Sequence, residues 1–519
     1  MKRLWLDLGD PGIFLRTIHD TSAWQDHGLG LLRTIMDKAG IRSDVASTRN
    51  YANIEEVSDI LEGYDMLLMN IRSYNLNYAE QAARLFKIAN PKGWVIVGGM
   101  HATLAPEDLL NNPDFDRICQ GDGENIIIGL ASDPSAFDRM TKGEKSKSLN
   151  DWPFIDRLVW PRPKTQTYHF PLEPAFAPFG PSPMVSIITS RVCPWRCSFC
   201  NEASYIPAME RKSPEQIVEE LNYLDKFYGP IGSVMIHDSL FFQQPDWLER
   251  WAEVYPSKAR KVWPYWAAAR ADTVRRWPDL FLSVARETNW STISIGLESG
   301  SNNTLRTLNK ECTAEDNIFA ISLINRLGDE FEAQGRPAPK IFSNIIYGSP
   351  GETKEDALDT LRMLTFVKRP LISSAYFAPY PGAALGYQII AEGKSLMAEK
   401  DHLRNAGKHN MEGVDYEFFN DILAGKYTKD AWDTRNIWLS KNSASDGVLR
   451  QLENFRAASS IFSFQMTNGG IKLSYGQNAE EAYSTLKYRL TEDEMALVIE
   501  NSGVKTKQTQ IHSLKNLLK

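Results

Sequence analysis

Strand-like and helix-like stretches alternate along two long parts of this chain, and this alternation limits the folds available to it. In residues 1–130 helical patterns separate four apolar stretches, KRLWLDLG, YDMLLMNI, GWVIVGG and FDRICQGDGE. Alternation of this kind predicts a parallel sheet with helices on both faces. We therefore expect an α/β, doubly wound (Rossmann-like) domain over residues 1–135, whose ligands would bind at the carboxyl ends of the strands.

The alternation returns after a proline-rich linker at residues 136–183. Six strand-like stretches follow in residues 184–395, from MVSIITS to LISSAYFAPYPG, with helical patterns between them. About six βα units in a row predict a closed or nearly closed barrel, with its chemistry at the carboxyl ends of the strands. The strand signal fades in residues 396–519, where helix-like stretches such as EDEMALVIENSG predict a mostly helical C-terminal region of unknown role.

Composition and charge argue against several classes of partner. The formal net charge is −7, whereas nucleic-acid-binding proteins are usually basic, so we expect no nucleic-acid partner. No apolar run reaches the ~18 residues that a membrane-spanning helix needs, and MKRLWLDLGDPG does not resemble a signal peptide. The five cysteines are odd in number and mostly clustered, which does not suit a disulfide framework. We expect a cytoplasmic protein without a membrane span, and we interpret Cys119 and Cys312 as ordinary buried residues.

The other three cysteines, Cys193, Cys197 and Cys200, lie in the segment CPWRCSFC a few residues after a predicted strand. Thiolates at this spacing can converge on one metal centre. A zinc ion normally takes four protein ligands, and His169 and His237 are isolated in the sequence. An iron–sulfur cluster usually takes four thiolates, so three would leave one iron open to a substrate or cofactor. Zinc and chance clustering stay open as alternatives at this point.

The CxxxCxxC spacing at the end of a first barrel strand resembles the cysteine loop of the radical S-adenosylmethionine (radical SAM) superfamily. The resemblance extends in order through IHDSLFF, IGLESGSNNTLRTLNK, IIYGSPGETKED and PYPGAALG. It implies a partial (β/α)6 barrel in which Cys193, Cys197 and Cys200 hold a 4Fe–4S cluster and SAM chelates the fourth iron. The residues that it implies at the SAM site are Phe199, Asp238, Glu298, Lys310, Gly348, Pro350, Gly351 and Glu352.

Two glycine-containing stretches of the N-terminal domain, VIVGGMHATLAPEDLL and ICQGDGENI, each begin in a predicted strand. Glycines at such positions let the backbone approach a bulky ligand, and the plain tight turns of a doubly wound domain are the alternative. Both stretches resemble the cobalamin-binding domain found before a radical SAM barrel. The residues that this resemblance implies at a cobalamin site are Gly98, Gly99, His101, Ala102, Gly121, Gly123 and Glu124.

The DxHxxG signature, whose histidine ligates cobalt in other cobalamin proteins, is absent from this sequence. Radical SAM relatives commonly lack it too, and the resemblance then places a residue of the loop NIRSYN beneath cobalt. Our candidate is Arg72, with Ser73 and Tyr74 as alternatives. We give equal weight to the alternative that Arg72 is simply an exposed surface charge, since arginine is mostly exposed.

The resemblance implies an enzyme that methylates an unactivated carbon through a 5′-deoxyadenosyl radical and methylcobalamin. It also implies a small-molecule or peptide substrate and an external one-electron reductant such as flavodoxin or ferredoxin. Our candidates for the substrate site are Arg270 and Tyr376, proposed as catalytic, and Tyr380, Trp160 and Tyr168. Three alternatives stay open: a cyclase, ring-rearranging or oxidising enzyme without methyl transfer, a radical SAM enzyme whose N-terminal domain binds no corrinoid, and a non-enzymatic metal scaffold.

Overall fold

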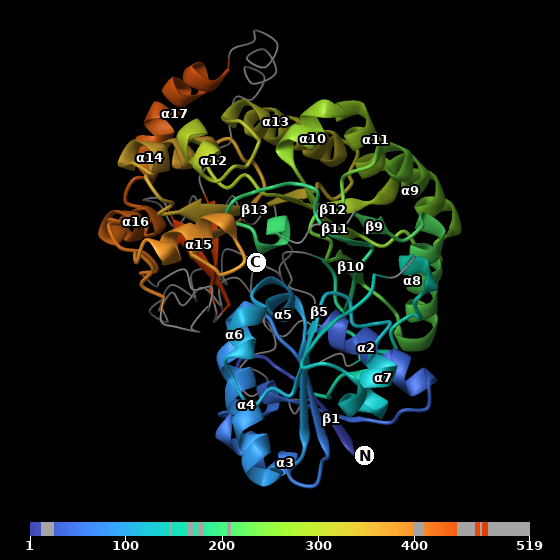
Figure 1. Cartoon of the computed structure of the whole chain (residues 1–519). Coiled ribbons are helices and arrows are strands. Elements are labelled where there is room, and N and C mark those ends of the chain that lie inside the picture. Colours follow the sequence, from blue (N-terminus) through green and yellow to red (C-terminus); the bar gives the residue numbers. More distant parts are fainter. Residues whose placement is uncertain are drawn as a thin grey trace, which may run out of the picture.

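The computed structural model of this chain contains two large parallel β-sheets, and the N-terminal part lies below the barrel in the view of Figure 1. The residues that the structure describes are 1–11, 25–145, 148–163, 171–173, 180–204, 209–397, 409–443, 462–467 and 470–475.

Six parallel strands form the N-terminal sheet in the order β2-β1-β3-β4-β5-β6. They are β1 (Arg3–Asp7), β2 (Asp44–Ser47), β3 (Met66–Asn70), β4 (Trp94–Gly98), β5 (Arg117–Gln120) and β6 (Met140–Lys142). From β1 the chain moves first to β2 on one side and then to β3 on the other. The strand order therefore reverses between β1 and β3, which is where ligands of doubly wound sheets bind.

Each face of this sheet has its own core, because successive side chains of a strand point to opposite faces. Leu67 and Met69 of β3 pack on the face that is covered by α3 (Ser58–Leu61) and α4 (Leu76–Ala89). Met66 and Leu68 pack on the other face, with α2 (His27–Lys38) and α7 (Ile127–Ser132). Figure 1 shows these two groups of helices on opposite sides of the sheet. The predicted doubly wound domain is confirmed.

Two strands of this sheet were not expected from the sequence. β6 lies inside the segment that we predicted as a linker, and its Met140 pairs with Ile118 of β5. The sheet therefore extends beyond residue 135. β2 is also short and has the sequence DVAS. β6 has only three residues and β2 begins and ends with a polar residue, so neither shows an apolar pattern that identifies a strand.

The barrel sheet consists of six parallel strands that pair in chain order, as a (β/α) barrel requires. They are β7 (Met184–Ile187), β10 (Ser233–Ile236), β11 (Tyr265–Ala269), β12 (Trp290–Ile295), β13 (Lys340–Tyr347) and β14 (Pro370–Tyr376). Among the described strands β7 and β14 are the two edges of this sheet, so the barrel is partial, as predicted.

Helices cover the outside of the barrel in Figure 1. They are α8 (Pro214–Tyr228), α9 (Pro245–Lys258), α10 (Ala271–Arg276), α11 (Pro278–Thr288), α12 (Asn302–Thr307), α13 (Ala314–Ala333) and α14 (Lys354–Leu364). Capping boxes begin two of them, Thr313 with Asp316 in α13 and Thr353 with Asp356 in α14. Each box satisfies two backbone N–H groups at the start of its helix, so these residues fix where the chain turns back along the barrel.

The described part of residues 396–519 contains two helices, α16 (Tyr416–Leu423) and α17 (Thr428–Asn442). It also contains an antiparallel hairpin that the sequence did not predict, β15 (Phe462–Thr467) and β16 (Gly470–Tyr475). The stretch EDEMALVIENSG lies outside the described residues. Within the described part of the chain, every helix is too short or too polar to cross a membrane.

Candidate functional site

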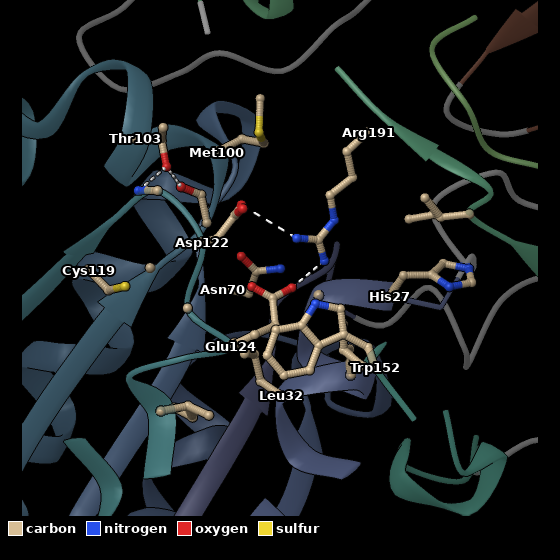
Figure 2. A pocket seen from close by; sticks show the side chains of 18 of the residues that line it. His27, Leu32, Asn70, Met100, Thr103, Cys119, Asp122, Glu124, Trp152 and Arg191 are labelled. Carbon is tan, nitrogen blue, oxygen red and sulfur yellow. Dashed lines mark hydrogen bonds and ion pairs between the residues drawn. The ribbon is translucent and has the colours of Figure 1, made fainter. Parts of the chain in front are cut away.

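A cavity of about 590 Å³ lies where the carboxyl ends of the N-terminal strands face the first strands of the barrel (Figure 2). One wall comes from α2 and from the residues that follow β3, β4 and β5. The other wall comes from the residues that follow β7 and β10, and the linker adds Trp152 and Ile155. The cavity therefore lies at the carboxyl ends of strands from both sheets, but the three clustered cysteines and the predicted SAM residues do not belong to its described lining.

Six of the residues predicted for a cobalamin site line this cavity: Arg72, Gly98, Gly99, Gly121, Gly123 and Glu124. The other four, Ser73, Tyr74, His101 and Ala102, do not belong to its described lining. His101 is 1% exposed, with its Nδ1 atom 3.0 Å from Ser73 Oγ and its Nε2 atom 3.3 Å from Asp108 Oδ2. Ala102 belongs to the core behind the wall. His101 and Ala102 lie on the buried side of α5 (Met100–Leu104), so they point away from the cavity. Met100 and Thr103 of the same helix line the cavity.

Gly99 allows the end of β4 to lie directly against the end of β3. A Cβ atom at this position would lie 2.0 Å from Asn70 Oδ1 and 2.7 Å from the Ile71 carbonyl oxygen. The residue also has a φ of 99°, a conformation that glycine adopts without steric cost. This close approach brings the loops after both strands into one wall of the cavity.

Arg72 extends from the loop after β3 toward the start of α2. Its Nη2 atom lies 3.9 Å from Asp26 Oδ2, and its side chain is 46% exposed. Asp26 caps α2 by accepting from the Leu29 backbone N–H at 3.0 Å, and its Oδ1 atom also accepts from Asn70 Nδ2 at 2.7 Å. The Asp26 carboxylate raises the pKa of Arg72. A permanently charged guanidinium therefore lies at the cavity wall.

Arg191 of β8 (Ser190–Arg191) reaches across the cavity to the N-terminal domain (Figure 2). Its Nη1 atom lies 3.4 Å from Asp122 Oδ1, and its Nη2 atom donates to Glu124 Oε1. The Glu124 side chain is 6% exposed and that of Arg191 is 27% exposed. This ion pair ties the glycine loop after β5 to the segment that leads directly into Cys193.

The loop with Cys193, Cys197 and Cys200 docks on the segment that follows α12. Ser198 donates its backbone N–H to the Leu308 carbonyl at 2.9 Å, and Cys200 donates its own to the Cys197 carbonyl at 3.1 Å. The three cysteines are free thiols. Burial raises the pKa of Cys193, and burial with the nearby Glu202 raises that of Cys200 to about 12. These two thiols therefore stay protonated at neutral pH until a bound metal centre supplies positive charge.

A single metal ion has no site of three or more His, Cys, Asp and Glu side chains among the described residues. Zinc requires its four ligands around one point. An iron–sulfur cluster binds each cysteine thiolate to a different iron, so its ligands stand further apart. The donor set of three cysteines on one loop fits such a cluster.

Glu298 and Lys310 form a buried ion pair at the carboxyl end of β12. Lys310 Nζ lies 3.1 Å from Glu298 Oε1, and both side chains are 7% exposed. Burial lowers the pKa of Lys310, but Glu298 raises it, and the net shift is upward, so the lysine stays charged. Lys310 Nζ also lies 5.8 Å from the centre of the Phe199 ring. A Cβ atom at Gly296 would lie 2.4 Å from Glu298 Oε1, so glycine at 296 leaves room for the pair.

The turn that follows β13 lies beside this ion pair. The Ile346 backbone N–H donates to the Glu298 carbonyl at 3.0 Å, and Phe199 packs against the apolar cluster that contains Ile346. Gly348 and Gly351 adopt φ values of 69° and 76°, which glycine favours. Of the predicted SAM residues, Phe199, Glu298 and Lys310 lie together at this edge of the barrel. Gly348, Pro350 and Gly351 belong to the turn that follows β13.

Two carboxylates expected near SAM, Asp238 and Glu352, accept hydrogen bonds from backbone groups of neighbouring loops. Asp238 accepts from the backbone N–H groups of Thr189 at 2.7 Å and Ser190 at 2.9 Å, and from the Thr189 hydroxyl. Glu352 accepts from the Ser349 backbone N–H at 3.0 Å, and burial raises its pKa to about 8. These side chains fix the loops that carry the site.

Arg270 and Tyr376, our candidates for catalysis, do not belong to the described lining of the cavity. Arg270 is 5% exposed and lies against the cysteine loop, with its Nη1 atom 3.5 Å from Cys197 Sγ. The Tyr376 hydroxyl donates to Asn420 Oδ1 at 2.6 Å. Arg270 follows β11 and Tyr376 ends β14, but Arg270 lies against Cys197 and Tyr376 lies against α16.

The remaining substrate candidates also lie elsewhere. Trp160 is 4% exposed in the core beneath α2, where its Nε1 atom donates to the Asp26 carbonyl at 2.9 Å. Tyr380 follows β14 and does not belong to the described lining of the cavity. Tyr168 lies outside the described residues.

Several residues of the cavity wall gave no signal in the sequence. His27 and His237 lie with ring centres 5.8 Å apart, and Lys212 Nζ lies 2.6 Å from Glu220 Oε2. These residues come from four separate segments, so no local motif contains them. Arg191 could have been found from its position at a strand end beside the cysteine motif.

These features define an α/β protein in which a doubly wound sheet and a partial barrel with a cysteine loop both contribute walls to one cavity. The family model described as the radical SAM superfamily matches residues 187–364, so this chain carries a radical SAM domain. The identification of that superfamily from the sequence is confirmed.

The relatives of this chain include proteins with different named activities. An uncharacterized methyltransferase of Pyrococcus horikoshii is 24% identical over 359 residues, which are 65% of this chain and 72% of the relative. An anaerobic magnesium-protoporphyrin IX monomethyl ester cyclase of Rubrivivax gelatinosus is 23% identical over 323 residues, which are 58% of this chain and 54% of the relative. The match thus spans about half the length of the cyclase.

Two solved structures share the fold. The cobalamin-dependent S-adenosylmethionine radical enzyme OxsB, with aqua-cobalamin and S-adenosylmethionine bound, gives a TM-score of 0.57 at 16% identity over 87% of this chain and 70% of that one. The radical S-adenosylmethionine methyltransferase TsrM from Kitasatospora setae, with cobalamin and a [4Fe-4S] cluster bound, gives 0.54 at 14% identity over 77% of this chain and 80% of that one. At these identities the likeness establishes the fold.

Proposed function

We propose that this protein is a cobalamin-dependent radical SAM enzyme that methylates an unactivated carbon atom. The observation that carries the proposal is the shared cavity. The glycine loops after β4 and β5 form one wall, and Ser190, Arg191 and Val192, which lead into Cys193, belong to the other. A ligand of the N-terminal domain would therefore lie beside the segments that lead into and out of the cysteine loop, although the three cysteines themselves do not belong to the described lining. The fold shared with OxsB and TsrM, whose structures contain cobalamin, supports this.

The residues of both walls suit the proposed cofactors. Gly98, Gly121 and Gly123 present only backbone to the cavity, which leaves space for a flat macrocycle. When bound, a 4Fe–4S cluster supplies the electron that cleaves SAM, and a corrinoid supplies a transferable methyl group. Arg72 would face the corrinoid. The three cysteines would hold the cluster, and the Glu298–Lys310 edge of the barrel would hold SAM.

The same proposal includes its partners and setting. A small-molecule or peptide substrate would bind between the corrinoid and the barrel, and an external reductant such as flavodoxin or ferredoxin would supply electrons. The five cysteines are free, which suits a reducing compartment such as the cytoplasm.

A cyclase or another ring-modifying enzyme without methyl transfer is the second candidate. The similarity to the cyclase of Rubrivivax gelatinosus favours it. Both candidates would use the same two cofactor sites, so only the fate of the SAM methyl group separates them.

The test uses the full chain, reconstituted anaerobically with iron, sulfide and hydroxocobalamin and then desalted. We expect retained corrinoid, 5′-deoxyadenosine after reduction with dithionite, and transfer of label from CD3-SAM to the bound corrinoid. SAM cleavage without label transfer would favour the cyclase. Protein that retains no corrinoid would overturn both candidates and leave a radical SAM enzyme with an empty N-terminal domain.

A further inference from the structure

Arg270 is a buried cation that touches a cysteine of the proposed cluster. Arg270 lies between β11 and α10, and it is 5% exposed. Its Nη1 atom donates to Cys197 Sγ at 3.5 Å. The centre of its guanidinium lies 3.7 Å above the centre of the Trp195 ring, a favourable cation–π distance. The arginine therefore contacts the cysteine loop at two positions, one of them a sulfur.

The other guanidinium nitrogens fix this arrangement. Nη2 donates to the Lys310 carbonyl at 2.5 Å, and Nε donates to Asp272 Oδ1 at 2.9 Å. Because Lys310 pairs with Glu298, Arg270 connects the cysteine loop to the proposed SAM edge. The guanidinium is planar and rigid, so the contacts of its other nitrogen atoms restrict the movement of Nη1 away from Cys197.

A cation at this place has an electrostatic consequence for electron transfer. One-electron reduction adds a negative charge to an iron–sulfur cluster, and hydrogen bonds to the sulfurs help to set the reduction potential. A guanidinium beside a ligand thiolate stabilises the more negative, reduced form, and the weak screening in a buried site strengthens that effect. Asp272 offsets part of the charge, so the net effect depends on the direct contact with sulfur.

We propose that Arg270 is a positioning residue that raises the reduction potential of the cluster by donating a hydrogen bond to the Cys197 thiolate. The proposal rests on the proposed function, because it requires a cluster on Cys193, Cys197 and Cys200. It assigns Arg270 to the control of electron entry in place of the substrate contact that we predicted from the sequence.

The experiment is an anaerobic potentiometric titration of the reconstituted full chain, followed by the EPR signal of the reduced cluster. We expect Arg270→Gln to shift the midpoint to a more negative potential, and Arg270→Lys, which keeps the charge, to shift it less. Arg275→Gln is the matched control, because Arg275 lies on α10 but pairs with Glu315 and Asp316 of α13. Its midpoint should equal that of the wild type.

An Arg270→Gln midpoint equal to that of the control, with a normal EPR signal, would overturn the proposal while leaving the proposed function intact. If Arg270→Gln holds no cluster, Arg270→Lys decides. A midpoint more negative than that of the wild type supports the proposal, and a midpoint equal to that of the wild type overturns it. Wild-type protein that assembles no cluster would overturn the proposed function itself.

Discussion

Arg191 and Glu124 form an ion pair across the cavity, from β8 to the glycine loop that follows β5 of the N-terminal sheet (Figure 2). The Glu124 side chain is 6% exposed, so its carboxylate depends on this cation for compensation. Removal of one member of such a pair leaves a buried charge without its partner, which costs about 1–3 kcal/mol or more. The pair therefore couples the stability of two walls that belong to different sheets.

We expect Arg191→Gln to lower the free energy of unfolding by about 1–3 kcal/mol. The double variant with Glu124→Gln should lose less than the sum of the two single variants, because the second change removes the unpaired charge. Denaturant unfolding followed by tryptophan fluorescence measures both effects. Lys429→Gln is the control: its pair with Asp433 is exposed, and we expect a change below about 1 kcal/mol. Strictly additive single effects would contradict the coupling.

The three clustered cysteines should be indispensable for cleavage of SAM and dispensable for binding of corrinoid. Cys193→Ala, Cys197→Ala and Cys200→Ala should each abolish formation of 5′-deoxyadenosine, since each removes a ligand of the proposed cluster. Corrinoid retention after desalting should survive, because the glycine loops lie in the other domain. Cys312→Ala is the control, as Cys312 lies in the core of the barrel. Loss of corrinoid together with the cluster would show that the two sites are not separable.

Arg72 should affect the environment of a bound corrinoid, because its charged guanidinium lines the cavity. We expect Arg72→Ala to change the absorption spectrum of the reconstituted protein and to slow turnover, since the substitution removes a cation from the proposed corrinoid site. Arg84→Ala, which removes an exposed arginine of α4, should change neither property. An unchanged spectrum and unchanged turnover in Arg72→Ala would remove Arg72 from the site.

The sequence predicted the fold well because long apolar strands and amphipathic helices produce clear periodicity. β3 (MLLMN) is buried on both faces and shows as a continuous apolar run, and all six barrel strands were found in the same way. β6 was not predicted, because a strand of three residues at a sheet edge produces no such pattern. The sequence around it is also rich in proline and charged residues.

The candidate site was only partly predictable, because local motifs do not report which way a side chain points. The motifs located Cys197, Glu298 and the glycine loops. They did not show that His101 faces the core or that Arg270 turns toward a cysteine. Contacts such as Arg191 with Glu124 join residues 67 positions apart, and no single segment of sequence contains both partners.

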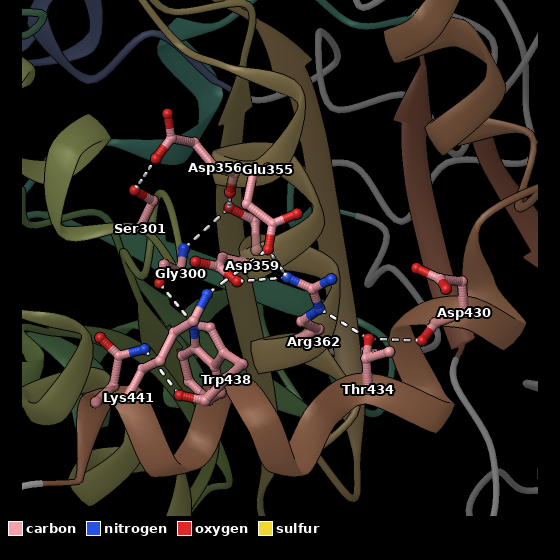
Figure 3. A network of polar contacts seen from close by, with 12 residues as sticks. Gly300, Ser301, Glu355, Asp356, Asp359, Arg362, Asp430, Thr434, Trp438 and Lys441 are labelled. Atoms are coloured by element: carbon pink, nitrogen blue, oxygen red, sulfur yellow. Dashed lines mark hydrogen bonds and ion pairs between the residues drawn. The ribbon is translucent and has the colours of Figure 1, made fainter.

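Helix α17 contacts the loop that follows β12 (Figure 3). Trp438 is fully buried, and its Nε1 atom donates to the Gly300 carbonyl at 2.8 Å. Arg362 of α14 also binds α17, because its Nε atom donates to Thr434 Oγ1 at 2.9 Å. Gly300 lies two residues after Glu298, so the C-terminal region supports the proposed SAM edge from outside the barrel.

We therefore expect Trp438→Phe to weaken SAM binding as well as to destabilise the fold. The phenylalanine leaves the buried Gly300 carbonyl without its indole donor, at a cost of about 1–3 kcal/mol. Calorimetric titration of SAM into the reconstituted protein measures the first effect and denaturant unfolding the second. Trp432→Phe, on the same helix, is the control. Destabilisation with unchanged SAM affinity would restrict Trp438 to a structural role.

His27 and His237 face each other in the cavity wall, with ring centres 5.8 Å apart. Burial, followed by the positive charge of Arg157, lowers the pKa of His27 well below its usual value, and burial lowers that of His237 to about 3. In the unfolded chain both titrate near ~6.5. Below that pH the unfolded state therefore binds more protons, so the stability that the neutral rings provide is complete above about pH 6.5 and is lost as the pH falls toward their folded pKa values.

The free energy of unfolding should consequently fall between about pH 7 and pH 5, by at most ~1.4 kcal/mol per pH unit for each histidine. His237→Gln, which cannot be protonated, should make this dependence shallower in urea unfolding measured across that range. His409→Gln is the matched control, because His409 is exposed and its removal should leave the slope unchanged. If wild type and His237→Gln lost stability equally with falling pH, other groups would account for the dependence, and the buried pair would have no part in it.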